Sequence, residues 1–87
     1  PHNPSGPVAH AHTVHVCAAL GITEAVEQQF AESPLFETGV RGNAPVLRDG
    51  HFRASAEPGL GIVVDEAILD GHPPGDVALS LFDPSFA

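Results

Sequence analysis

The sequence contains no lysine and no methionine, and arginine occurs only three times. Eleven acidic residues stand against these arginines, so the formal net charge is −8 at neutral pH. A chain of this charge repels phosphate backbones and offers no basic face to anionic lipid, which argues against nucleic-acid and membrane-surface partners. No apolar run approaches the roughly 20 residues that a membrane-spanning helix needs.

Cysteine is nearly absent too, since the chain contains only one. A single cysteine excludes an internal disulfide and suits a reducing compartment, so we expect a cytoplasmic protein. The Ala/Val-rich surroundings of Cys17 predict a small buried side chain and not a nucleophile. Glycine and proline are frequent, at nine each, but they are scattered without a repeat, which argues against a low-complexity linker.

The chain opens with PHNPSGP, which cannot form regular structure because its prolines lack backbone donors and restrict the residues before them. Ser5 or Gly6 is suited to cap a helix, and Pro7 suits the first helical turn. The Ala-rich run that follows ends before Gly21, a residue type favoured at helix C-termini. We therefore predict a helix over 8–20.

The middle of the chain carries weaker signals. Residues 22–30, ITEAVEQQF, are compatible with a helix or with a short strand around Ala25–Glu27. The stretch 31–48 is rich in turn-forming residues, and we predict one short helical turn near Pro34–Thr38.

Two turn signals organise the remainder. Asp49-Gly50 is a strong hairpin-turn signal, and the next four residues, HFRA, alternate as a strand does. Pro58–Gly61 predicts a second turn, which leads into a β-branched strand at Ile62–Val64. Asp65 is placed to cap a short helix that begins EAIL. The tail after Leu69 is poorly patterned, and we expect it to be loosely held. One helix and a few short strands would make a poor independent core, so the organisation is typical of the end of a domain.

Four of the six histidines fall within the first 15 residues. On a strand, His10 and His12 would share a face and could chelate zinc, and on a helix His12 and His15 could face the same way, but a metal would still need a third ligand. On the helix that the alanines favour, His10 and His12 lie about 200° apart, which excludes joint ligation. We therefore expect partly exposed helix histidines, one of them packed at an interface. His51 and His72 lie in turn-like surroundings and are expected to be solvated. A non-enzymatic His-rich metal-binding module is the competing hypothesis.

Two other side chains are candidates for catalysis. His2 precedes a rigid turn that leads into a helix, and the strand-to-helix junction is where βα-barrels place catalytic groups. Glu27 would end the short strand, if that strand forms. From the residues alone, an ordinary side chain without a catalytic role is the favoured interpretation of each. The other carboxylates that we considered are interpreted as solvated or capping: Glu24, Glu32, Glu37, Glu57, Glu66 and Asp70.

Three stretches together resemble the mandelate-racemase branch of the enolase superfamily, which includes acid-sugar dehydratases of the galactonate dehydratase type. PHNPSGPVAHAHTVHVCAAL is similar to the end of the seventh barrel strand and the next helix, where those dehydratases often have His-x-Pro-x-Gly-Pro and then an Ala-rich helix. AVEQQF resembles the next strand, which commonly ends in a Glu-Gln pair. DGHFRASAEPGLGIVVDE resembles the closing segment, and the match runs roughly from Pro1 to Leu69.

The resemblance implies an α/β fold, namely the C-terminal part of a modified (β/α)7β barrel of the TIM type plus its closing segment. Residues 1–48 would supply the last βα units of this enolase-type barrel, and residues 49–87 would form the C-terminal closing segment and tail. The chain would then be the C-terminal fragment of a protein several times longer, and the isolated fragment is expected to be inactive.

The resemblance also implies roles for site residues. His2 matches the histidine that forms a dyad with an Asp outside this chain and exchanges a proton with the carbon next to the substrate carboxylate. Glu27 matches the glutamate that hydrogen-bonds the substrate carboxylate, a role that needs a protonated side chain and therefore a raised pKa in a closed site. Asn3 stands where some dehydratases have another small residue, and it is a weak candidate for substrate binding.

The implied reaction is that of a Mg²⁺-dependent hydro-lyase of carbohydrate-acid catabolism, with its three acidic metal ligands on earlier strands. Loss of a β-hydroxyl from the enediolate would give a 2-keto-3-deoxy acid, whereas return of the proton to the other face would make the protein a racemase or epimerase. We favour dehydration of a sugar acid because the His-Asn-Pro-x-Gly-Pro turn looks more like that of the dehydratases. We expect the full-length protein to be a homo-oligomer.

Overall fold

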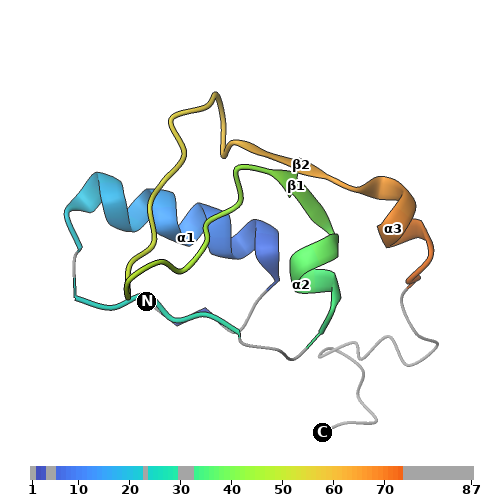
Figure 1. Cartoon of the computed structure of the whole chain (residues 1–87), viewed down its shortest axis with the longest axis horizontal. Coiled ribbons are helices and arrows are strands. Elements are labelled where there is room, and N and C mark those ends of the chain that lie inside the picture. The colour runs from blue at the N-terminus through green and yellow to red at the C-terminus, as the bar shows by residue number, and fades with distance from the viewer. Residues whose placement is uncertain (1, 4–5, 23, 30–32, 74–87) are drawn as a thin grey trace, which may run out of the picture.

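A computed structural model of the chain describes residues 2–3, 6–22, 24–29 and 33–73 (Figure 1). The predictions for Ser5, Glu32 and the tail from residue 74 onward lie outside these residues. The elements in chain order are α1 (Pro7–Leu20), α2 (Leu35–Thr38), β1 (Val40–Gly42), β2 (Ile62–Val64) and α3 (Glu66–Asp70). No helix within the described ranges has the length and hydrophobicity that crossing a membrane would require.

The long helix α1 forms where the sequence predicts it and has the predicted ends. Gly6 is the N-cap and Pro7 takes the first helical position, where a missing backbone donor costs nothing. Gly21 adopts a left-handed conformation with φ of 68°. The backbone N–H of Gly21 donates to Ala18 O (3.4 Å), and that of Ile22 donates to Cys17 O (2.9 Å). Both bonds satisfy carbonyls that the last turn would otherwise leave unpaired, as in a Schellman motif.

The core of the described part is small and lies along one face of α1. Its buried apolar side chains are Ala11, Val14, Cys17 and Val40. The burial of Cys17, which is 3 % exposed, confirms its prediction as a small core residue. The opposite side of α1 leaves Val16 and Leu20 more than half exposed. A core of this size is consistent with a fragment of a larger barrel domain.

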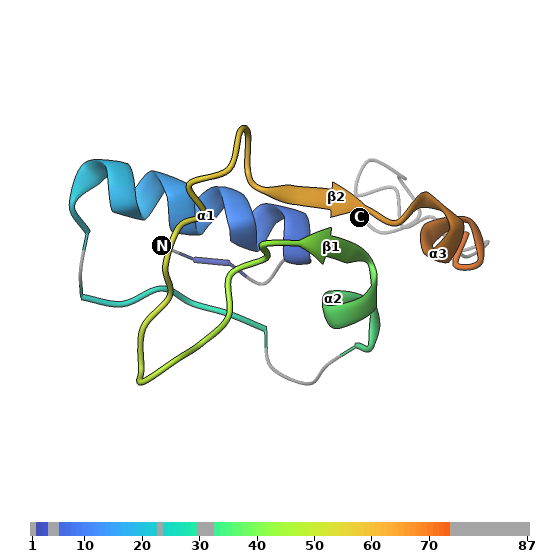
Figure 2. The same cartoon turned by 45° about the horizontal axis from the view of Figure 1, so that its top comes forward.

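Two short strands form an antiparallel pair, which Figure 2 shows beside α1 and next to α2. The register pairs Val40 with Val64 and Gly42 with Ile62. The strand β2 confirms its prediction, whereas β1 lies inside the stretch that we expected to be only turns. Three residues, of which the last is a glycine, carry too little alternation for a strand to be recognised from the sequence.

The Asp49-Gly50 turn forms as predicted, but the strand after it does not. Both turn residues have positive φ, 51° and 75°, which is the type I′ geometry of tight hairpins. The backbones of Arg48 and His51 exchange two hydrogen bonds of 2.9 Å. Pairing stops there, so the strand predicted over 51–54 is wrong. The other arm contains Pro45, which cannot donate to a ladder.

The remaining turn and cap predictions are confirmed. The backbone N–H of Gly61 donates to Pro58 O across the second turn, at 3.3 Å. The carboxylate of Asp65 accepts the N–H of Ile68 at 3.1 Å and so caps α3. The predicted helical turn near Pro34–Thr38 is α2, with Pro34 as its N-cap.

The segment 24–29 forms neither the helix nor the strand that the sequence left open. The segment runs along α1 (Figure 1) and lies next to residues 2–3, since the Asn3 side chain donates to Glu27 O. A strand is defined by hydrogen bonds to a partner, and this segment meets its described neighbour mainly through side chains of Asn3 and Glu27.

Candidate functional site

The two side chains predicted to be catalytic lie next to each other. The Nδ1 atom of His2 is 2.9 Å from Oε2 of Glu27, although α1 and its flanking loops separate the two residues in the chain. Both side chains face solvent, at 81 % exposure for His2 and 49 % for Glu27. The crossover through α1 therefore brings the end of one segment beside the other, which is the relation that adjacent barrel strands have.

Asn3 holds the Glu27 segment next to the His2 segment through two hydrogen bonds. Its backbone N–H donates to Oε2 of Glu27, and its side-chain amide donates to the backbone oxygen of Glu27 at 3.2 Å. The residue is only 3 % exposed. The substrate-binding role of Asn3 stays a prediction, while its contacts in the structure give it the role of joining the two segments.

In the open site, the surroundings of Glu27 favour its ionised form. Its pKa is lowered, chiefly by the backbone N–H of Asn3 and further by the charge and hydrogen bond of His2, while partial burial acts in the opposite direction. The carboxylate is therefore ionised at neutral pH. The site described here is open to water and surrounds the anion with donors, so the raised pKa expected for a closed site stays a prediction.

Among the described residues, the large side chain that is most completely buried is that of His10, one of the histidines predicted to lie on the helix. His10 is 1 % exposed, and its Nδ1 lies 3.2 Å from the Asn3 amide nitrogen. Its ring packs edge-on to Phe52, with centroids 4.7 Å apart, and tilted to Phe36 at 5.7 Å. Burial lowers the pKa of His10, so the imidazole is neutral.

A signal for the burial of His10 was present in the sequence. His10, Val14 and Cys17 recur at the helical spacing i, i+4, i+7 and therefore share one face of α1. The spacing of the histidines from one another does not reveal this relation, because it depends on the apolar residues Val14 and Cys17.

The other two histidines of the HxHxxH pattern point elsewhere. His12 donates from Nδ1 to Val8 O at 3.0 Å and is exposed, while His15 donates from Nε2 to Leu60 O at 3.3 Å. The three imidazoles thus have three different surroundings. In residues 2–3, 6–22, 24–29 and 33–73, no three His, Cys, Asp or Glu side chains gather closely enough to hold a metal ion. His51 and His72 are exposed, as predicted.

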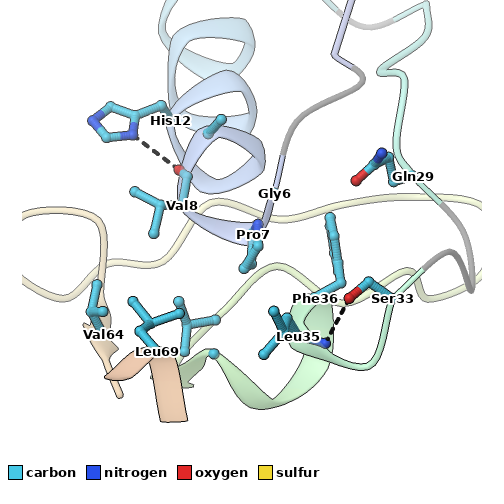
Figure 3. A pocket seen from close by; sticks show the side chains of 13 residues that line it. Gly6, Pro7, Val8, His12, Gln29, Ser33, Leu35, Phe36, Val64 and Leu69 are labelled. Atoms are coloured by element: carbon cyan, nitrogen blue, oxygen red, sulfur yellow. Dashed lines mark hydrogen bonds between the residues drawn. The ribbon is translucent and has the colours of Figure 1, made fainter. Parts of the chain in front are cut away.

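A cavity of about 700 Å³ lies at the N-terminal end of α1, and Figure 3 shows the side chains around it. Leu35, Phe36, Val64 and Leu69 line it from the later elements, against Pro7 and Val8 of the helix. Neither His2 nor Glu27 belongs to this lining. Because the lining is mostly apolar, the cavity does not suit a polyhydroxylated acid, and it is separate from the candidate site.

Comparison with known protein families decides the assignment of the chain. The family model described as enolase C-terminal domain-like matches residues 1–68. The chain belongs to the enolase C-terminal domain-like family. Comparison with curated proteins and with solved structures returned no match.

Family membership confirms the superfamily that the three motifs indicated. It also confirms that the fold is part of an α/β barrel of the TIM type. Membership indicates an enzyme of the lyase or racemase kind, and enzymes of the enolase superfamily generally use Mg²⁺.

Proposed function

We propose that this chain supplies two active-site side chains, His2 and Glu27, to an acid-sugar dehydratase of the enolase superfamily. The observation that carries the proposal is the 2.9 Å approach of the His2 imidazole and the Glu27 carboxylate on segments joined by the α1 crossover. Family membership supports the reaction class, and the His-Asn-Pro-x-Gly-Pro turn favours dehydration over racemisation or epimerisation.

The chemical task is to remove a weakly acidic proton from the carbon next to a carboxylate. His2 presents Nδ1–H to the carboxylate of Glu27, which leaves the lone pair of Nε2 as the proton acceptor. The exposed position of the ring lets Nε2 reach a substrate. When the C–H bond breaks, the proton moves to Nε2 and its electrons enter the enediolate. That proton then leaves with the β-hydroxyl as water when the C–O bond breaks, and the resulting enol becomes a 2-keto-3-deoxy acid.

Glu27 has a different task in the complex from the one that it has in the open site. A substrate carboxylate beside the Glu27 carboxylate would place two like charges at close range, which raises the pKa of a carboxyl group. Exclusion of water acts in the same direction. We infer that Glu27 becomes protonated on substrate binding and donates to the substrate carboxylate, while an Asp outside this chain takes over the Nδ1–H of His2, as the family resemblance implies.

The residues described here do not form a magnesium site by themselves. Mg²⁺ takes octahedral oxygen coordination, commonly with one or two protein carboxylates. Oε2 of Glu27 is already engaged by Asn3 and His2, and no cluster of three ligand residues occurs in the described part of the chain. The ligands of the proposed Mg²⁺ would therefore come from other strands, and we assign no step to the metal. The sugar-acid substrate, the homo-oligomeric state and the cytoplasmic location stay predictions.

The decisive experiment replaces His2 by Asn in the full-length polypeptide that carries this chain. We expect turnover of sugar acids, and deuterium exchange at the carbon next to the carboxylate, to be lost while Mg²⁺ binding is retained. His51→Asn is the matched control, because His51 is also exposed but lies in the Asp49-Gly50 turn. Normal turnover and exchange in His2→Asn would contradict the proposal.

A further inference from the structure

We propose that His10 is the positioning residue of this site and that it acts through Asn3 to hold the Glu27 segment against the His2 segment. The consequence for catalysis rests on the function proposed above, but the positioning itself has a readout that needs no turnover. The connection joins the buried side chains of His10 and Asn3 to the exposed Glu27, and the structure gives each of its contacts.

The side-chain amide of Asn3 is the centre of the connection. Its nitrogen carries two hydrogens, of which one is directed to Glu27 O and the other to Nδ1 of His10, each at 3.2 Å. An amide nitrogen only donates, so Nδ1 of His10 must be the acceptor and its ring proton must sit on Nε2. The lowered pKa of His10 supports this neutral form, since a protonated ring would have no lone pair to offer Asn3.

The imidazole is in turn fixed by its surroundings. Phe36 of α2 and Phe52, just after the Asp49-Gly50 turn, both contact the ring. Asn3 cannot turn away without leaving its buried amide without a partner, which is unfavourable. The position of Glu27 relative to His2 is thereby coupled to the packing of α1 against the closing segment.

The other ring nitrogen shows why packing alone does not account for a histidine at this position. Nε2 of His10 is buried and has no hydrogen-bond partner among the described residues. A leucine or phenylalanine would occupy a similar volume without burying an unsatisfied donor. The arrangement is understandable if the Nδ1 acceptor is needed, because the bond to Asn3 is what an apolar side chain could not make.

The pKa of Glu27 reports on this connection, because the backbone N–H of Asn3 is the largest cause of its lowering. In the full-length polypeptide, His10→Leu removes the acceptor for Asn3, and we expect the pKa of Glu27 to rise. His10→Asn offers an oxygen near the position of Nδ1, and we expect it to restore the lowered pKa. Titration of the ¹³C-labelled Glu27 carboxylate by NMR, assigned by comparison with Glu27→Gln, measures both effects.

Val14→Ala is the control for a purely structural effect. Val14 is buried on the same face of α1, and none of the contacts that join His10, Asn3 and Glu27 involves it. We expect this variant to lose stability without moving the pKa of Glu27. If His10→Leu folds and leaves that pKa at its wild-type position, the inference is overturned. If His10→Leu does not fold, Asn3→Ala decides, since an unchanged Glu27 pKa in that variant would overturn the inference equally.

Catalysis provides the second readout. We expect His10→Leu to lower kcat about tenfold with little change in KM, the size of effect that loss of one ordinary hydrogen bond produces, and His10→Asn to recover most of it. Absence of sugar-acid turnover in the wild-type polypeptide would refute the proposed function alone, because the NMR titration would still test the positioning.

Discussion

At the scale of single residues, the carboxylate of Glu27 governs the electrostatics of the candidate site. It accepts the backbone N–H of Asn3 and faces the imidazole of His2. Both partners favour its ionised form, so in the absence of ligand the carboxylate is an anion that accepts hydrogen bonds from Asn3 and His2. An arriving anion would raise the pKa of this carboxyl group, which is the change that the proposed role of Glu27 requires.

The lowered pKa of Glu27 predicts a pH-dependent contribution to stability. A carboxyl group whose pKa is lower in the folded state stabilises that state above the unfolded-state pKa, and the contribution is lost as pH falls through the folded-state pKa. We therefore expect Glu27→Gln to be less stable than wild type at neutral pH, and the difference to shrink as the pH falls below the ordinary glutamate range and through the lowered pKa.

Chemical denaturation of the full-length polypeptide at a series of pH values measures this difference. Glu24→Gln is the matched control, because Glu24 is an exposed carboxylate on the same segment. We expect this control to keep the unfolding free energy of the wild type at neutral pH. A difference between Glu27→Gln and wild type that is constant across the pH range would show that Glu27 does not titrate as described.

At the scale of elements, features that depend on a few adjacent residues were predicted more successfully than features that depend on residues far apart in the chain. The caps of α1, the type I′ turn at Asp49-Gly50 and the Asp65 cap of α3 depend on a few adjacent residues, and all of them form as predicted. The strands are different, because a strand depends on a partner elsewhere in the chain. This is why β1 was missed and why no ladder extends beyond His51.

The candidate site shows the same division. The motifs indicated His2 and Glu27, and the structure brings them together. The hydrogen bond between Asn3 and His10 could not be predicted. It depends on the packing of the His10 ring against two phenylalanines from other parts of the chain. A buried polar contact of this kind is specified by three-dimensional packing and leaves no spacing in the sequence.

The close approach of β1 to the residue that precedes β2 allows a prediction about stability. Gly42 has φ of 90°, and a Cβ atom there would lie 2.7 Å from the backbone oxygen of Gly61. Alanine at this position meets both a strained backbone conformation and the backbone of Gly61, which directly precedes β2. We therefore expect Gly42→Ala to lower the free energy of unfolding of the full-length polypeptide by roughly 2–4 kcal/mol.

Gly59→Ala separates the two causes. Gly59 also has a positive φ, 65°, but a Cβ atom there would meet nothing within 4 Å. Its substitution should therefore cost only the backbone strain, about 1–2 kcal/mol. Chemical denaturation of both variants measures the two losses, and equal losses would show that the close approach of the two strands does not contribute.

At the scale of the whole molecule, the surface of α1 indicates a further layer of protein beyond the residues that the structure describes. The helix buries Val14 and Cys17 on one side but leaves Val16 54 % and Leu20 70 % exposed on the other. A helix that is apolar on both sides is typical of an element buried between two layers. In a barrel, neighbouring βα units would supply the second layer.

This arrangement predicts that an exposed residue of the chain behaves as a core residue in the full-length polypeptide. We expect Leu20→Ser to destabilise that polypeptide by about 1–3 kcal/mol, because a buried leucine would be replaced by a polar group. Ala19→Ser is the matched control, since Ala19 is the exposed residue immediately before it in the last turn of α1 and carries little apolar surface. We expect the control to stay within about 0.5 kcal/mol of wild type. Urea denaturation compares the two variants, and equally small effects would mean that this side of α1 faces water in the complete protein, so that no neighbouring unit packs there.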